Sequence, residues 1–152
     1  DILILSGDVP ALSAETLDSL YQTHRRQNAY GTVLTAIFEN PSGYGRIVRN
    51  DDDTLQGIVE EKDADDEIRK IKEINSGIYI FRGELLFDYL RKVDNDNAQK
   101  EYYLPDILPM LVRDGYKVAL QVARDPDEIS GINTIEQLQE VEEKILLKQG
   151  EA

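Results

Sequence analysis

Four consecutive apolar residues, Ile2 to Leu5, stand near the start of the chain. A strand with one solvated face would alternate apolar and polar side chains, so this run predicts a strand buried on both faces. Gly7 lets the backbone turn and Pro10 cannot continue a ladder, which leaves Asp8 as the first carboxylate beyond the strand. Ligands of open α/β sheets bind beyond the carboxyl ends of strands, so Asp8 is a candidate for binding a metal or phosphate. A carboxylate that caps a local turn is the commoner alternative.

Along the rest of the chain, segments with a helical repeat of apolar residues alternate with short segments rich in apolar and β-branched residues. Helices are expected at about 14–28, 64–72, 83–90, 105–113 and 134–148, and strands at 32–38, 47–49, 54–59, 74–81 and 116–123. This alternation, with one hairpin inserted at 47–59, predicts an α/β domain of three layers with a mostly parallel sheet.

Glycines and a carboxylate mark two places where a ligand could approach the backbone. Gly43 and Gly45 stand on either side of Tyr44, as in a loop whose backbone comes close to a ligand. A plain turn into a strand explains the same residues equally well. Glu60 directly follows a predicted strand, and it points into a cleft or belongs to a charged surface.

Other polar residues also have both a functional and a structural interpretation. Asn75 and Ser76 open an otherwise apolar strand, and an amide that donates and accepts at once suits a sugar hydroxyl. Tyr103, beside a second tyrosine at a loop–helix junction, flanks a ligand or fills a gap beneath the loop. Asn133 is a ligand or the cap of the last helix, where two overlapping capping boxes fit. His24 is assigned no role, because no partner residues cluster around it.

The charge of the chain restricts its partners. Seventeen basic and 30 acidic residues give a formal net charge of -13. This charge repels nucleic-acid phosphates and anionic membranes, so neither is expected as a partner. A phosphorylated ligand would need a divalent cation to bridge it to the carboxylates.

The absence of cysteine excludes disulfides and thiolate metal sites, and it argues against zinc. No apolar run approaches the roughly 18 residues of a membrane span, and no signal peptide is recognisable, so a cytoplasmic location is expected. The chain opens at Asp1 directly on a core strand without an initiator methionine. We therefore expect it to be a fragment of a longer polypeptide.

Six motifs occur in a fixed order over nearly the whole chain. They are residues 7–10 (GDVP), 43–47 (GYGRI), 59–63 (VEEKD), 73–78 (EINSGI), 97–103 (NAQKEYY) and 131–133 (GIN). In order and spacing they resemble the sugar-nucleotide pyrophosphorylases, a nucleotidyltransferase family with a three-layer, Rossmann-like nucleotide-diphospho-sugar transferase fold. The run at 97–103 is most similar to the uridylyltransferase domain of the bifunctional bacterial enzymes that make UDP-N-acetylglucosamine.

The resemblance implies a Mg²⁺-dependent reaction between UTP and N-acetylglucosamine 1-phosphate. A phosphate oxygen of the sugar phosphate would attack the α-phosphorus of UTP, giving UDP-N-acetylglucosamine and pyrophosphate. Asp8 and Asn133 would hold the Mg²⁺, with Asp8 as the catalytic residue. Such in-line transfer needs positioning and charge neutralisation more than a protein nucleophile.

The resemblance also implies a sugar site. The sugar would contact the backbone N–H of Gly45, the carboxylate of Glu60 and the amide of Asn75. The other positions carried over are Ser6 and Gly7, beside the sugar, and Ser76 and Tyr103, at the acetamido pocket.

Several family features are missing from this sequence. They are the Gly-rich nucleotide loop with its arginine and lysine, the uracil-reading segment, and the acetyltransferase domain of left-handed β-helix repeats. Pro105 replaces a threonine that usually follows the tyrosine pair. Residues 1–132 therefore resemble the sugar- and metal-binding part of a pyrophosphorylase domain, and 133–152 a helix leading to a further domain.

The fragment alone is expected to be inactive. The resemblance implies a cytoplasmic parent enzyme of cell-wall precursor synthesis, with homotrimers formed through the missing domain. A non-catalytic nucleotide-sugar-binding module and a transferase for another sugar or nucleotide are the alternatives.

Overall fold

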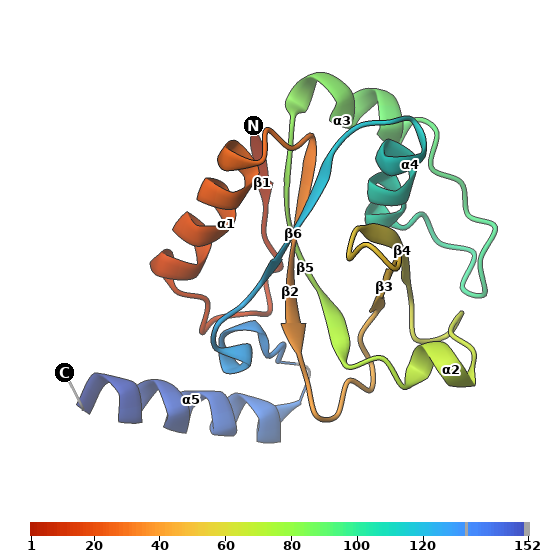
Figure 1. Ribbon diagram of the computed structural model, residues 1–152. Helices are drawn as coiled ribbons and strands as arrows, with labels where there is room; N and C mark the ends of the chain where they lie inside the picture. The colour runs from red at the N-terminus through yellow and green to blue at the C-terminus, as the bar shows by residue number, and fades with distance from the viewer. Residues whose placement is uncertain (133, 151–152) are drawn as a thin grey trace.

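The computed structural model describes residues 1–132 and 134–150, in which one six-stranded sheet is flanked by helices (Figure 1). The elements follow as β1 (Ile2–Ile4), α1 (Ala14–Arg26), β2 (Gly31–Ile37), β3 (Arg46–Arg49), β4 (Leu55–Val59), α2 (Asp66–Arg69), β5 (Glu73–Phe81), α3 (Gly83–Leu90), the 3₁₀ helix η1 (Leu104–Asp106), α4 (Ile107–Arg113), β6 (Val118–Val122), the 3₁₀ helix η2 (Pro126–Ile129) and α5 (Ile135–Gly150). No helix in these described ranges is long and apolar enough to span a membrane.

β5 lies at the centre of the sheet. Along one edge it pairs antiparallel with β2, and along the other it pairs antiparallel with β3 at its start and with β1 at its end. β6 pairs parallel with β2, and β4 pairs antiparallel with β3. β1, β2, β3 and β6 therefore run in one direction, with β5 opposed to them.

The prediction of an α/β fold is confirmed, but the prediction of mostly parallel pairing is wrong for the described strands. Only β2 and β6 form a directly parallel pair. The reason lies in the connection from β2 to β5, which begins at Ile37 and returns to Glu73 directly opposite it. A parallel pair needs a crossover to the other end of the sheet, whereas this connection stays at one end and carries the β3–β4 hairpin.

The prediction that the first strand is buried on both faces is also wrong. Ile2 and Ile4 pack against one apolar core, whereas Leu3 and Leu5 are 45% and 49% exposed. The helix on the face of Leu3, α1, packs against β2, β5 and β6. It leaves the neighbouring surface of β1 uncovered, so one face of this strand is open to solvent.

Two apolar cores on opposite faces of the sheet confirm the three layers. α1 closes one core, in which Leu20 packs with Leu34 and Ile78. α3 and α4 close the other core, in which Leu86 and Leu108 contribute side chains. Alternate residues of β2 and β5 face the two cores, as the pleat requires: Val33 and Tyr79 face one, and Leu34 and Ile78 face the other.

The predicted helix starts are largely confirmed. Ser13 caps α1, because its hydroxyl accepts a hydrogen bond from the Thr16 N–H at 3.1 Å. At the start of α5, Thr134 and Gln137 form a capping box with reciprocal hydrogen bonds of 3.1 and 3.2 Å. Asn133 lies outside the described residues.

Candidate functional site

An open cavity of about 430 Å³ lies beside the middle of β5. On this edge of the strand β3 pairs at Ile74 and β1 begins to pair at Tyr79, so the ladder is interrupted between them. The interruption leaves room for side chains from loops at several strand ends. Six predicted site residues line the cavity, namely Ser6, Asp8, Gly45, Glu60, Asn75 and Ser76.

Gly45 and Glu60 face each other across the base of the β3–β4 hairpin. Arg46 pairs with Val59 in the ladder, so the residue before β3 meets the residue after β4. A Cβ added to Gly45 would lie 2.8 Å from Glu60 Oε1, which is too close for two non-bonded atoms. Glycine is therefore required here for the carboxylate to sit against the backbone.

The Glu60 carboxyl lies in an electrostatically unfavourable place. Burial raises its pKa, and the nearby carboxylates of Asp106 and Asp63 raise it further. A hydrogen bond from the Asn75 side chain acts in the opposite direction. Glu60 is thus a partly desolvated hydrogen-bond acceptor, which suits recognition of a ligand hydroxyl.

Asn75 is tied into the site from several sides. Its backbone N–H donates to the Gly45 carbonyl at 2.9 Å. Its side-chain Oδ1 accepts hydrogen bonds from the Tyr79 hydroxyl at 2.9 Å and from the Gly77 N–H at 3.2 Å. The amide is 8% exposed, so a single buried side chain connects the core to the cavity.

Ser76 lines the cavity, but its hydroxyl serves the sheet. It donates to the Leu34 carbonyl at 2.6 Å and accepts from the Ile78 N–H at 3.1 Å. These bonds satisfy the backbone where the β2–β5 register shifts between Val33 and Thr35. The Ser76 hydroxyl is therefore engaged in holding a β-bulge.

Ser6, two residues beyond the end of β1, packs against the same irregularity. Its hydroxyl donates to the Gly77 carbonyl at 3.3 Å, and a Cβ on Gly77 would lie 2.5 Å from Ser6 Oγ. Gly77 also has a φ of 77°, which side chains rarely adopt. Gly7, which follows in the chain, is exposed and does not line the cavity.

Asp8 is exposed at the mouth of the cavity. Its backbone carbonyl accepts a hydrogen bond from the Ile132 N–H at 2.9 Å. Nearby, the Tyr44 hydroxyl accepts from the Gly131 N–H at 3.1 Å. Both bonds fasten the segment that leads to Asn133 onto the loops that carry Asp8 and Tyr44.

The charge of the lining has one sign. Asp8 and Glu60 are the charged side chains among the described lining residues, and both are acidic. No group of three potential metal-ligating side chains occurs among the residues that the structure describes. The described carboxylates alone could not fill the coordination shell of a metal here, so other ligands would have to complete it.

Tyr103 does not line the cavity. Its hydroxyl accepts a hydrogen bond from Gln99 Nε2 at 2.7 Å. The Lys62 ammonium bonds to the same Gln99 side chain, and the Asp63 carboxylate accepts from the Ala98 N–H at 2.8 Å. The 97–103 loop is thereby held against the residues that follow β4.

Sequence reasoning missed the Tyr79 contact and the Tyr44 contact. Tyr79 fits the apolar pattern of its strand, which does not by itself indicate a bond to the site. Its spacing of four from Asn75 was the available signal, since residues i and i+4 of a strand share a face. Tyr44 was recognised as bracketed by glycines, but its partner 87 positions away has no local signature.

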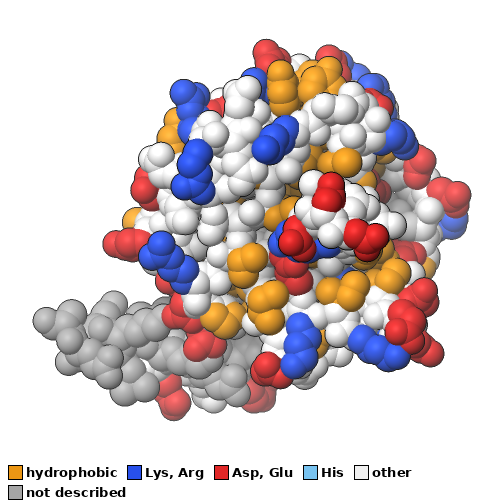
Figure 2. All heavy atoms as spheres, in the orientation of Figure 1, with side chains coloured by type: hydrophobic (Ala, Val, Ile, Leu, Met, Phe, Trp, Pro, Cys, Tyr) orange, Lys and Arg blue, Asp and Glu red, His pale blue; other side chains and the backbone are white. Residues whose placement is uncertain are grey.

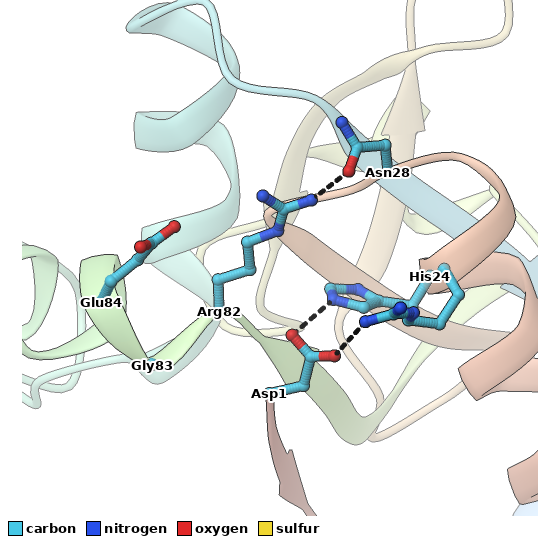
Figure 3. A pocket seen from close by; sticks show the side chains of 7 residues that line it. Asp1, His24, Asn28, Arg82, Gly83 and Glu84 are labelled. Carbon is cyan, nitrogen blue, oxygen red and sulfur yellow. Dashed lines mark hydrogen bonds and ion pairs between the residues drawn. The ribbon is translucent and has the colours of Figure 1, made fainter.

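The fold also contains a larger cavity, of about 610 Å³, at the other end of β1 (Figure 3). There the buried His24 lies 2.7 Å from Thr32 Oγ1 and 3.4 Å from the Asp1 carboxylate. Burial and the charges of Arg82 and Arg25 lower the pKa of His24 to about 4. This histidine is packed and neutral near pH 7, in agreement with the sequence interpretation.

Comparison with known proteins identifies close relatives. A profile of the nucleotidyl transferase family matches residues 1–144. The bifunctional protein GlmU of Staphylococcus epidermidis is 48% identical over 143 residues, which are 94% of this chain and 32% of that protein. The bifunctional protein GlmU of Thermosipho africanus is 50% identical over 145 residues, which are 95% of this chain and 31% of that protein. The chain thus spans about a third of the length of these relatives.

The fold is shared with a solved structure of lower sequence similarity. A crystal structure from Bacillus anthracis, assigned as a glucose-1-phosphate thymidylyltransferase and determined with sucrose, aligns with a TM-score of 0.57. The alignment has 18% identity and covers 80% of this chain and 45% of the other. Because the family profile matches well over half of the sequence, the chain belongs to the nucleotidyl transferase family.

Proposed function

We propose that the protein carrying this chain transfers UMP from UTP to N-acetylglucosamine 1-phosphate. The convergence of Gly45, Glu60 and Asn75 on one cavity with Asp8 at its mouth carries the proposal. The similarity to proteins named bifunctional GlmU supports it, as do the six motifs that resemble uridylyltransferases. A transferase for another sugar or nucleotide would release pyrophosphate only with a different substrate, and a non-catalytic nucleotide-sugar-binding module would release none.

The three inner residues offer complementary contacts to a sugar. Glu60 provides a carboxylate acceptor for a hydroxyl, and Asn75 provides an amide beside it. Gly45 lacks a side chain, so a ligand can reach the backbone at this point. Ser6 supports these residues through Gly77, and Gly7, Ser76 and Tyr103 belong to the surroundings of the site.

Asp8 and Asn133 would hold a Mg²⁺ ion between the protein and the phosphates. The donor set fits this ion, because Mg²⁺ commonly takes one or two protein oxygen ligands and completes its shell with phosphates and water. An acidic lining without lysine or arginine among its described residues also needs a cation to accept a phosphate. The bound ion would neutralise charge on the phosphates.

Two further observations support a ligand role for Asn133. The Ile132 N–H bonds to the Asp8 carbonyl, which ties the preceding residue to the Asp8 loop. The capping box of α5 is supplied by Thr134 and Gln137, so helix capping gives no separate reason for an asparagine at this position.

The reaction then needs no nucleophile from the protein. A phosphate oxygen of the sugar phosphate forms a bond to the α-phosphorus of UTP, the bond from that phosphorus to the bridging oxygen breaks, and pyrophosphate leaves. The residues of this chain bind the sugar phosphate and orient its attacking oxygen. Orientation of this kind can supply much of the rate enhancement of phosphoryl transfer.

The wider setting follows from the same resemblance and belongs to the proposal. The parent protein would act in the cytoplasm in cell-wall precursor synthesis, carry a second activity, and assemble as a homotrimer through a further domain. Residues 1–132 would form the sugar- and metal-binding part and 133–152 the connecting helix. The isolated chain would bind the sugar phosphate without turnover.

The test is pyrophosphate release by the full-length protein with UTP, N-acetylglucosamine 1-phosphate and Mg²⁺. We expect turnover in the wild type and a loss of about a hundredfold in Asp8→Asn. Asp51→Asn, in the exposed turn of the β3–β4 hairpin, is the matched control and should keep full activity. Absence of release with this sugar phosphate, or an Asp8→Asn variant as active as the wild type, would contradict the proposal.

A further inference from the structure

Tyr79 reaches the candidate site from inside the core. Its side chain is 3% exposed, and its ring packs beside Phe81 with 5.8 Å between ring centroids. Burial raises the pKa of its hydroxyl well above the ordinary value, so the hydroxyl keeps its proton. This proton is donated to Asn75 Oδ1 over 2.9 Å, across the boundary between the apolar core and the cavity.

The hydrogen bonds that Asn75 accepts show which end of its amide carries the oxygen and which the NH₂ group. Oδ1 accepts from the Tyr79 hydroxyl and from the Gly77 N–H, which fills both of its lone pairs. The donor end of the amide is then left for the side of Glu60, where its hydrogen bonding lowers the pKa of the Glu60 carboxyl. A continuous series of polar contacts thus runs from Tyr79 through Asn75 to Glu60.

We propose that Tyr79 is a positioning residue of the sugar site, whose hydroxyl holds the Asn75 amide in place beside Glu60 and the cavity. This inference rests on the proposed function, because it assigns the ligand of Asn75 and Glu60 as an N-acetylated sugar 1-phosphate. Tyr79 itself does not line the cavity and acts only through Asn75.

Removal of the Tyr79 hydroxyl would leave Oδ1 with the Gly77 N–H alone. On that side the Asn75 side chain would then be held by one hydrogen bond instead of two, because a phenyl ring neither donates nor accepts. The positions of the Asn75 amide and of the Glu60 carboxylate would become less defined. The consequence is weaker and less selective sugar binding, in addition to any loss of stability.

Tyr89 offers a matched control for Tyr79. It is also buried, at 4% exposure, belongs to the same apolar core, and donates its hydroxyl to the Asp114 carboxylate. It does not line the candidate cavity. Tyr79→Phe and Tyr89→Phe therefore each remove one hydroxyl that donates a hydrogen bond, but only the first removes a bond to the site.

The first measurement compares KM and kcat of the two variants in the full-length protein. We expect Tyr79→Phe to raise KM for N-acetylglucosamine 1-phosphate about tenfold, the effect of losing one well-placed hydrogen bond. KM for UTP should stay within about twofold, and Tyr89→Phe should change neither KM. Equal KM values for the sugar phosphate in the two variants would overturn the positioning role.

The second measurement does not depend on turnover. Crystal structures of the full-length variants at about 1.2 Å resolution would define the Asn75 amide from its contacts. We expect a displaced or disordered Asn75 side chain in Tyr79→Phe and an unchanged one in Tyr89→Phe. An unchanged Asn75 and Glu60 in Tyr79→Phe would overturn the inference, whereas an inactive wild type would overturn the proposed function and leave this structural comparison decisive.

Discussion

At the scale of single residues, Gly45 contributes to the site through the side chain it lacks. In Gly45→Ala the new methyl group would lie 2.8 Å from Glu60 Oε1, so the carboxylate would have to move. We expect the Kd for N-acetylglucosamine 1-phosphate to rise about tenfold or more, with a small change in thermal stability. Calorimetric titration of the variant measures the effect.

Gly57→Ala is the matched control for Gly45→Ala. An added Cβ at Gly57, within β4 of the same hairpin, meets no atom within 4 Å. Its affinity should equal that of the wild type. The double variant Gly45→Ala/Glu60→Asp, which shortens the obstructed side chain, should recover part of the lost binding; equal affinities of all three variants would contradict the close-approach argument.

The Glu60 carboxylate that we assign to ligand binding also lowers the stability of the folded state, by an amount that depends on pH. Its folded pKa is raised above the ordinary value of 4.5, chiefly by burial. The folded state therefore binds more protons between these two pKa values, and stability falls as pH rises through that window. Above it, the charged carboxylate penalises the folded state by a constant amount.

Glu60→Gln should remove this cost and weaken binding at the same time. The variant should gain melting temperature over the wild type, and this gain should be larger at pH 7 than at pH 4. Its affinity for the sugar phosphate at pH 7 should fall. Thermal unfolding at the two pH values measures the first effect. The exposed Glu143→Gln should show no such difference, and the idea fails if Glu60→Gln behaves like it.

Six of the residues predicted from the sequence line one cavity, but their hydrogen-bond partners were not predicted. The local pattern made Gly45, Glu60 and Asn75 candidates, each with a structural alternative, and the resemblance to sugar-nucleotide pyrophosphorylases assigned them to the sugar. The bond from Ser76 to Leu34 and that from Tyr79 to Asn75 depend on register and on the bulge in the sheet. Neither has a signature that a single sequence reveals.

At the scale of elements, a buried ion pair fixes the base of the β3–β4 hairpin. Arg46 is 2% exposed and lies 2.7 Å from the Glu61 carboxylate. Its guanidinium also donates to the Tyr44 carbonyl. One side chain therefore holds the residue before Gly45 and the residue after Glu60.

Arg46→Met should be strongly destabilising, because it removes the partner of the Glu61 carboxylate. The expected loss is about 3–5 kcal/mol when one member of a buried pair is removed, and less to the extent that Glu61 reaches solvent. Arg46→Met/Glu61→Leu should recover much of this stability without restoring sugar binding, since the bond to Tyr44 stays lost. Denaturant unfolding provides the measurement, and equal stability of Arg46→Met and the wild type would contradict it.

The positions of most elements were predictable, whereas their pairing was not. Periodicity located α3 at Gly83–Leu90 and the hairpin strands within a residue or two. The antiparallel position of β5 and the open face of β1 depend on the end of the sheet at which each connection re-enters it. The periodicity of the sequence does not contain this information. An uninterrupted apolar run such as Ile2 to Leu5 indicates a strand and does not establish what covers its faces.

At the scale of the whole molecule, charge determines how a phosphorylated ligand can approach. The formal net charge is -13, and acidic side chains are spread over the visible face in Figure 2. The two charged side chains among the described lining residues of the cavity, Asp8 and Glu60, are also acidic. Long-range repulsion and local chemistry thus both oppose an anion unless a cation intervenes.

The effects of salt and Mg²⁺ on the affinity for the sugar phosphate therefore distinguish two kinds of site. In one a cation bridges the phosphate to carboxylates, and in the other lysine or arginine side chains bind it. Without a divalent cation, raising NaCl from about 10 to 150 mM should strengthen the weak binding of N-acetylglucosamine 1-phosphate, because screening reduces the repulsion. Saturating Mg²⁺ should tighten binding much more, and EDTA should reverse that gain. N-acetylglucosamine, which has no phosphate, is the control and should respond to neither in calorimetric titrations. If salt instead weakens binding in the absence of Mg²⁺, basic residues hold the phosphate and the metal role assigned to Asp8 is wrong.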